Sequence, residues 1–462
     1  MKMRKERDSL GEMHVPSAAY YGIQTRRATE NFPVSGRRAH PLFVKAYAMI
    51  KQAASLTLQD LGRLDELRSK AIVAACDEIL EGKLADQFVV DVFQAGAGTS
   101  FNMNVNEVVA NRALEILGRS KGDYKFLSPN DHVNMAQSTN DTFPTAMHLA
   151  ALMLCQELEP NLKRLERALH QKGKEFHGVI KSGRTHLQDA VPVRLGDEFA
   201  AYGRAVGRAT RQIKEQAKDL EELAIGGTAV GTGLNAPPGY REGVVRRLGE
   251  TTGFRLREAA DLREAMQSRL AISSLSGALR GLALELIRIA NDLRLLSSGP
   301  TTGLAEIRLP PVQPGSSIMP GKVNPVILEC LNMIAFQIVG NDLTIAMAAQ
   351  AGQMELNVMM PVMIHNLLES MEILKNFLPP LVERCIEGIG VNTERCRSYL
   401  EKNPALATTL NPRIGYLKAA EVAKESIKRG VSIRELTKEK GLLSDEEVDA
   451  ILDPSVLVDP DE

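Results

Sequence analysis

The chain has 462 residues, with 56 Lys and Arg against 57 Asp and Glu, and its five cysteines are scattered without a C-x-x-C pair. The balanced charge excludes the basic excess that nucleic-acid binding requires, and the scattered cysteines indicate free thiols in a reducing compartment. The N-terminus is charged with no apolar run behind it, and we find no apolar stretch long enough to span a bilayer. The sequence therefore predicts a cytoplasmic protein with no membrane partner.

The composition favours helices over sheets. Tryptophan is absent and aromatic residues make up only 4% of the chain, whereas strands prefer aromatic and β-branched residues. In the first part, residues 1–140, the pattern predicts short helices near 46–60 and 68–81, separated by loops. We interpret this part as a mixed, mostly helical N-terminal domain.

The central part, residues 141–393, contains the longest helical patterns. The clearest is an apolar seam whose members are spaced 4, 3, 4, 3, 4 and 3 residues apart: Leu275, Leu279, Leu282, Leu286, Ile289, Leu293 and Leu296. It predicts a helix over 261–297. Further long helices are predicted over 144–172 (with Pro160 as a kink), 195–223, 325–348 and 356–377. Such long seams exceed what one chain covers, which predicts an oligomer associating through a helical bundle.

The last part, residues 394–462, returns to a polar composition. A helix is predicted at 416–428, and we interpret the segment as a small helical C-terminal domain. The expected architecture is therefore mainly α, with three domains and a long central helical bundle.

Residues 315–325 combine two serines, a lysine, an asparagine and two glycines directly before a predicted helix. Pro325 suits the first helical position and Asn324 the cap, so the loop places polar groups over a helix N-terminus, which attracts anions. An ordinary connector is the alternative interpretation. A nucleotide-binding P-loop is excluded, because five residues separate Gly315 from Gly321 and Val323 follows the lysine.

Three other polar clusters precede long predicted helices, at residues 96–102, 137–144 and 183–189. Each one alone is explained by ordinary helix capping. Together with the loop they predict a site for a small dicarboxylate, built from several helix starts. The glycine-rich run 226–235 would add donors but lacks the order of a dinucleotide site. The eight histidines are dispersed without an H-E-x-x-H motif, so no metal site is expected.

Residues 315–325 resemble the signature loop of the fumarase/aspartase superfamily. The resemblance extends over the whole chain through Thr99, residues 138–140, Thr185–His186 and the run 226–235. It implies a three-domain fold with a long central helical bundle, and a homotetramer whose active sites are each built from three subunits. These lyases cleave C–N or C–O bonds, release fumarate and generally use no organic cofactor.

Within the superfamily, residues 20–33, 94–100 and 352–357 resemble the aspartase branch, which implies reversible deamination of L-aspartate to fumarate and ammonia. Residues 140–148 are closer to fumarases, Met360 stands where aspartases often have Glu, and Arg194 is an unusual charge. Fumarate hydratase is therefore the alternative activity. A catalytically silent protein, like the lens crystallins derived from a related lyase, is a second alternative, which the intact polar residues argue against.

The resemblance assigns the general base to Ser316, supported by the charge of Lys322. A serine base must be ionised by its surroundings, and backbone N–H groups of the loop together with the lysine would stabilise the alkoxide. The carboxylate next to the abstracted proton is expected to bind hydroxyl donors, namely Thr99, Ser138, Thr139 and Ser317. The other carboxylate is expected at Lys322 and Asn324.

The resemblance also assigns neighbours to the substrate's amino group. These are Asn140, Thr185 and His186, of which His186 would otherwise be read as either structural or functional. In the superfamily this histidine pairs with a carboxylate on the helix after the loop, which is Glu329 here. That pair would fix the tautomer and orientation of the imidazole.

Overall fold

The computed structural model describes residues 2–458 and is mainly helical, as the composition predicted. The chain divides into two compact units. The first comprises the residues up to Glu159, Arg211–Gly281 and Phe336–Lys375. The second comprises Pro160–Thr210, Leu282–Ala335 and the residues from Asn376 onwards. The division into three domains at residues 140 and 393 stays a prediction.

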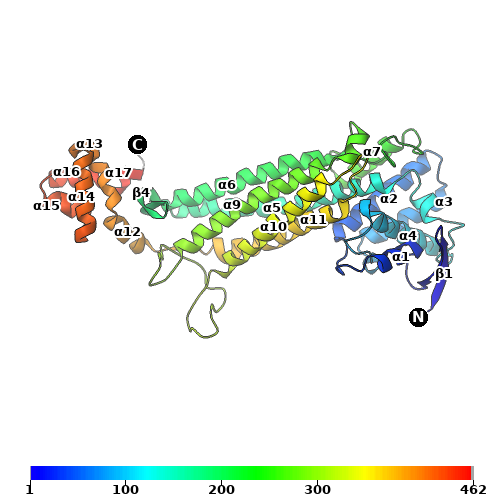
Figure 1. Ribbon diagram of the computed structural model, residues 1–462, viewed down its shortest axis with the longest axis horizontal. Helices are drawn as coiled ribbons and strands as arrows, with labels where there is room; N and C mark the ends of the chain where they lie inside the picture. The colour runs from blue at the N-terminus through cyan, green and yellow to red at the C-terminus, as the bar shows by residue number, and fades with distance from the viewer. Residues whose placement is uncertain (1, 459–462) are drawn as a thin grey trace. The chain divides into compact units, whose positions relative to one another are not determined.

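Long helices dominate the described part of the chain and contribute segments to both units (Figure 1). They are α5 (Thr139–Glu175), α6 (Leu195–Ala217), α9 (Leu270–Leu296), α10 (Val326–Gln350) and α11 (Met360–Leu381). All were predicted, with different ends. Helix α9 starts at Leu270 and not at 261, because the Asp261 side chain caps a separate short helix, α8 (Leu262–Gln267). Helix α6 ends at Ala217 and not at 223, and α5 continues through Pro160.

The apolar seam of α9 is buried along its whole length, with every member between 0% and 7% exposed. Polar contacts fix the neighbouring helix α10 against it in each unit. In the first unit Ser276 Oγ donates to Asp342 Oδ1 at 2.6 Å, and in the second Asn332 Nδ2 donates to Asn291 Oδ1 at 2.9 Å. The periodicity of the sequence therefore identified a true packing face.

The first unit also holds the N-terminal elements. An antiparallel hairpin, β1 (Met3–Asp8) and β2 (Gly11–Pro16), was not predicted. It is followed by α1 (Ile23–Asn31), α2 (Pro41–Asp60), α3 (Glu66–Leu80), α4 (Thr99–Ile116) and α7 (Tyr240–Thr252), with the short parallel pair β5 (Glu222–Leu223) and β6 (Arg257–Glu258). A cluster of aromatic rings forms the core where α2, α4 and α5 meet: Phe43, Tyr47, Phe101 and Phe143.

The second unit contains two antiparallel strand pairs: β3 (Ile180–Thr185) with β4 (Gln188–Arg194), and β7 (Ile307–Arg308) with β8 (Gly390–Val391). Its C-terminal helices are α12 (Thr393–Lys402), α13 (Asn411–Ile414), α14 (Tyr416–Arg429), α15 (Ile433–Glu439), α16 (Asp445–Ile451) and α17 (Pro454–Val458). Helix α14 matches the predicted helix at 416–428. Ser432 with Glu435 and Ser444 with Glu447 form capping boxes that fix the starts of α15 and α16.

Helices α9 and α10 are long and apolar enough to cross a membrane by length and composition, each with a mean hydropathy of 1.4. The criterion allows charged residues within the window, so the expectation that no uninterrupted apolar stretch spans a bilayer is not contradicted. Core helices of soluble proteins meet the same criterion. In each helix 39% of the window is buried within the chain.

Candidate active site

Thr99 is the first residue of α4, and a sharp turn places it there. Gly98 before it has φ +83°, and a Cβ at this position would lie 1.9 Å from a ring carbon of Phe143. Only glycine fits both the backbone conformation and the close approach. The Ala97 N–H donates to the Val358 carbonyl at 2.7 Å, which fixes the turn from the other side. The exposed Thr99 hydroxyl therefore has a rigid support.

The start of α5 carries the second predicted cluster. Ser138 Oγ accepts the Asn140 N–H at 3.2 Å, so this serine caps the helix while its own hydrogen remains available to donate. Thr139 Oγ1 accepts from Asn102 Nδ2 at 3.0 Å and likewise keeps its hydrogen to donate. Asn140 Nδ2 donates to the Ala229 carbonyl at 2.8 Å, which leaves its amide oxygen as an acceptor.

A buried lysine supports this cluster and was missed by the sequence analysis. Lys51, on α2, is 0% exposed, and its ammonium donates to amide oxygens of Asn102, Asn134 and Gln137 at 3.0, 3.1 and 2.8 Å. Burial lowers the pKa of Lys51 to about 7. Asn102 in turn donates to Thr139, so the lysine acts on a predicted substrate-binding residue through one intermediate side chain.

A buried aspartate links the same helix start to the glycine-rich run. The Asp141 carboxylate accepts the backbone N–H groups of Ser138, Gly226 and Thr228 at 2.9, 3.1 and 2.9 Å. Burial raises the pKa of Asp141 to about 7. These two N–H groups of the run are occupied by Asp141, so the expectation that the run adds donors for a ligand is not met at them.

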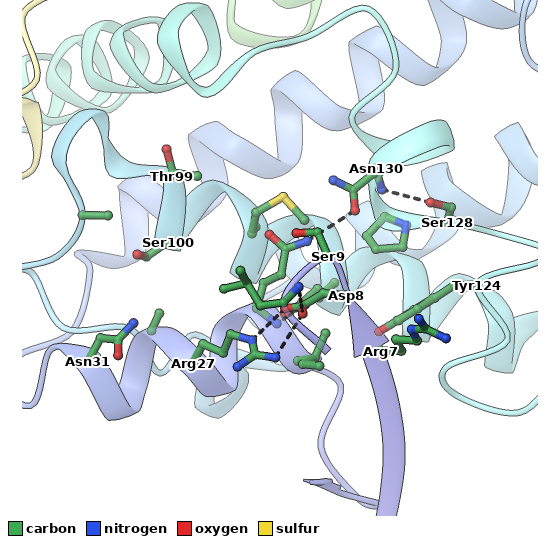
Figure 2. Close-up of a pocket in the computed structure, with 18 of the residues that line it drawn as sticks. Arg7, Asp8, Ser9, Arg27, Asn31, Thr99, Ser100, Tyr124, Ser128 and Asn130 are labelled. Atoms are coloured by element: carbon green, nitrogen blue, oxygen red, sulfur yellow. Dashed lines mark hydrogen bonds and ion pairs between the residues drawn. The ribbon is translucent and has the colours of Figure 1, made fainter. Parts of the chain in front are cut away.

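A cavity of about 680 Å³ lies beside Thr99 in the first unit. Figure 2 shows Thr99 and Ser100 on one side of it, with Tyr124, Ser128 and Asn130 on the other. Arg27 lines it as well, but its guanidinium is held by both carboxylate oxygens of Asp8, at 2.8 and 3.0 Å. The polar lining therefore combines hydroxyl and amide groups with the charged side chains of Arg7 and Glu107.

Thr185 and His186 lie at the tip of the β3–β4 hairpin and not at a helix start, which corrects the sequence interpretation of residues 183–189. His186 and Leu187 form the two-residue turn with φ of +54° and +59°, the geometry of a type I′ turn. Neither residue is the Asn or Gly that such turns favour, which explains why the hairpin escaped prediction. Both Thr185 and His186 are exposed at the tip.

The signature loop runs from β7 to α10 and hydrogen bonds to itself. The Gly315 N–H donates to the Lys322 carbonyl and Asn324 Nδ2 donates to the Gly315 carbonyl, both at 2.7 Å. Asn324 therefore closes the loop and does not cap the helix, which begins at Val326. Ser316 Oγ accepts the N–H groups of Ile318 and Met319 at 3.2 and 3.1 Å.

The predicted residues fall into two groups, one in each unit. Thr99, Ser138, Thr139 and Asn140 belong to the first unit, whereas Thr185, His186, Ser316, Ser317, Lys322, Asn324 and Glu329 belong to the second. Within the first group, Ser138 accepts the N–H of Asn140, and Asn102 donates to Thr139. Among residues 2–458, no hydrogen bond or ion pair joins His186 to Glu329, so their pairing stays a prediction for the assembled oligomer.

Metal binding was not expected from the sequence. Within the part of the chain that the structure describes, no three His, Cys, Asp or Glu side chains cluster as a metal ion would need.

Comparison with known proteins finds relatives of this chain among lyases. A family described as "Lyase" matches residues 11–340, and one described as "Fumarase C C-terminus" matches residues 406–459. The aspartate ammonia-lyase of Bacillus subtilis is 51% identical over 457 residues, covering 99% of this chain and 96% of the relative. The class II fumarate hydratase of Halobacterium salinarum is 51% identical over 452 residues, covering 98% and 96%.

A solved structure carries the same fold. The crystal structure of a fumarate lyase:delta crystallin from Brucella melitensis bound to cobalt has a TM-score of 0.95 and 50% sequence identity. The match covers 98% of this chain and 99% of that one. The mainly α architecture with long helices is therefore confirmed.

Proposed function

The chain belongs to the fumarase/aspartase superfamily of lyases, and from this premise we propose that it is an aspartate ammonia-lyase, a carbon–nitrogen lyase that converts L-aspartate reversibly to fumarate and ammonia. The observation that carries the proposal is that several near-full-length relatives are aspartate ammonia-lyases, among them those of Bacillus subtilis at 51% identity and Helicobacter pylori at 47%. The protein is proposed to act in the cytoplasm.

Ser316 is proposed to remove the Cβ proton of aspartate. Its oxygen already accepts two backbone N–H groups, from Ile318 and Met319, and these donors would stabilise the ionised serine without any rearrangement. Lys322 in the same loop adds a positive charge. The proton passes to Ser316, the electron pair moves into the adjacent carboxylate to form the aci-carboxylate, and its return expels ammonia.

The aci-carboxylate carries two negative charges and needs several donors. Thr99, Ser138 and Thr139 suit this role because each can donate its hydroxyl hydrogen, and Ser317 would add a fourth donor from the loop. A preorganised donor of this kind contributes roughly 3–4 kcal/mol at best to the stability of the transition state. Lys322 and Asn324 are proposed to hold the second carboxylate.

The leaving amino group needs acceptors. The amide oxygen of Asn140 suits this role, because its Nδ2 is committed to the Ala229 carbonyl. Thr185 and His186 are proposed as further neighbours, with His186 oriented by Glu329. No cofactor is required for this sequence of proton transfer and elimination.

The active sites are proposed to be shared between subunits of a homotetramer. Helix α10 supports this, because large apolar side chains lie exposed along one face: Met333, Phe336, Leu343 and Met347, between 57% and 65% exposed. Their spacing of 3, 7 and 4 residues keeps them on one side of a helix. Covering such a stripe with a second copy of the bundle would bury it.

Fumarate hydratase is the second candidate, favoured by the Halobacterium relative at 51% identity. The deciding assay follows fumarate absorbance with L-aspartate and L-malate supplied in parallel, together with ammonia release. Fumarate from aspartate alone, with equimolar ammonia, supports the proposal. Fumarate from malate alone would replace it with the hydratase.

A further inference from the structure

A buried group of charges lies behind the hairpin that carries His186. Glu306 is 0% exposed, and Arg184 donates to both of its carboxylate oxygens at 2.9 Å. Lys181 lies 3.4 Å from the same carboxylate and 3.1 Å from Glu198. The Arg184 guanidinium also lies 5.7 Å from the ring centre of Tyr399. All of these residues belong to the second unit.

Glu306 is itself held firmly by its main chain. Its N–H donates to the Leu296 carbonyl at the end of α9, and its carbonyl accepts the Asn392 N–H, at 2.9 and 2.8 Å. It directly precedes β7, which is paired with β8. The carboxylate therefore projects from a fixed point, at the start of the segment that continues into the signature loop.

Arg184 stands directly before Thr185, and it is the last charged anchor before the hairpin tip. The middle of the hairpin has a separate anchor, since Asn403 Nδ2 donates to Ser182 Oγ and to the Ala190 carbonyl at 2.7 and 2.6 Å. Beyond Arg184 the tip is exposed, and its turn uses two non-glycine residues with positive φ, a costly conformation. The strand ladder pairs Arg184 with Asp189 and Thr185 with Gln188, and the Arg184–Glu306 pair ties this end of the ladder to the rest of the unit.

We propose that Arg184 and Glu306 are positioning residues for the reaction. Their two parallel hydrogen bonds hold the end of β3 so that Thr185 and His186 are presented to the substrate in one conformation. A bidentate Arg–carboxylate pair suits this role because it fixes both distance and orientation. The inference rests on the proposed function, because it takes Thr185 and His186 to lie beside the amino group of the substrate.

The first test measures the tip without reference to activity. Because the chain contains no tryptophan, Leu187→Trp places a single fluorophore in the turn, at a side chain that is 72% exposed. In this background Glu306→Gln should lower the fluorescence anisotropy of the tip, since the amide cannot accept both guanidinium hydrogen bonds. Glu78→Gln is the matched control, because Glu78 forms a comparable bidentate pair with Arg112 at 2.6 and 2.7 Å in the other unit. Unchanged anisotropy in Glu306→Gln would overturn the proposal.

The second test separates positioning from general stability. Glu306→Gln should reduce kcat/KM by roughly 10²-fold, the cost of misplacing a reacting group by about 1 Å. In a Thr185→Ala/His186→Ala background the same substitution should cost almost nothing, because the groups it positions are gone. An equal loss in both backgrounds would assign the pair to folding alone.

A more conservative substitution serves as the test if Glu306→Gln fails to fold. Arg184→Lys keeps the charge but loses the bidentate geometry, and it should give the same two results to a smaller degree. If no lyase activity is found in the parent protein, the anisotropy measurement still decides whether the pair holds the tip. The failure of the proposed function and the failure of this inference are thus distinguishable.

Discussion

Lys51 Nζ lies 3.0 Å from Asn102 Oδ1, and both residues are buried. Because Asn102 also donates to Thr139, a lysine with no exposed surface helps to orient a predicted substrate donor through one side chain. In its protonated form the same side chain places a positive charge near the site proposed to accumulate negative charge. The orientation of Thr139 and the electrostatic potential around it thus both depend on the Lys51 side chain.

Replacing this lysine tests both effects. Lys51→Met keeps the length of the side chain but removes the ammonium that three amide oxygens share, so we expect kcat/KM to fall by roughly 10–10²-fold. The control is Lys45→Met on the same helix, which should change kcat/KM less than twofold. Equal rates in the two variants would contradict the role of Lys51.

The turn before Thr99 predicts a strict requirement for glycine. Gly98→Ala must place a Cβ 1.9 Å from Phe143 and also adopt a positive φ, so we expect the free energy of unfolding to fall by about 3–5 kcal/mol. Gly82→Ala isolates the backbone cost, because Gly82 has φ +89° with open space around it. That variant should lose only about 1 kcal/mol in urea denaturation. Similar losses for both would show that the Phe143 contact relaxes.

The proposed base predicts a selective loss of turnover. Ser316→Ala should lower kcat by roughly 10²–10⁴-fold, while the oligomeric state and the affinity for succinate, a non-reactive dicarboxylate, stay unchanged. Ser317→Ala removes a donor and not the base, so it should weaken substrate binding and reduce kcat less. Turnover of Ser316→Ala at the parental rate would reject the assignment.

Shared active sites predict complementation between inactive variants. Ser316→Ala and Thr139→Val carry their defects in different segments, so a refolded mixture should recover roughly a quarter of the parental activity if these segments come from different subunits. A mixture of Ser316→Ala with Lys322→Met should recover none, because every loop is then defective. No recovery in the first mixture would indicate that both segments come from the same subunit.

The pH dependence of stability should contain a contribution from His148. Burial, and then the nearby charge of Arg269, lower the pKa of His148 from 6.5 to about 4. The unfolded chain therefore binds more protons between these values, and stability is lost as the pH falls from 6.5 towards 4, by up to about 3 kcal/mol. Urea denaturation of His148→Gln should show a shallower dependence of stability on pH over this range, and the parental slope in that variant would contradict the prediction.

Helices were predicted well where one face is apolar throughout. The seam from Leu275 to Leu296 is a local pattern, and burial follows it residue by residue. The start of α9 was placed too early because α8 continues the helical composition, and the break at Ser268 has neither proline nor glycine to mark it. Helix existence is encoded locally, whereas this boundary depends on packing.

The supporting residues of the site were not predictable in the same way. A single lysine in a helix such as α2 normally lies in solvent, and only the contacts of Lys51 with residues 51, 83 and 86 positions away identify it as buried. Likewise, nothing local connects Arg184 to Glu306, 122 positions apart. The predicted hydroxyl, lysine and histidine residues came from motifs, and their roles stay predictions.

The signature loop carries its own hydrogen-bond network, and this affects how it can move. Since Gly315 bonds to Lys322 and Asn324 bonds back to Gly315, residues 315–324 should travel as one rigid lobe, with rotation confined to the connections at either end. The two N–H groups that hold Ser316 then travel with it. A lobe of this kind loses little conformational entropy when it closes over a substrate, and the base arrives with its anion-stabilising donors already in place.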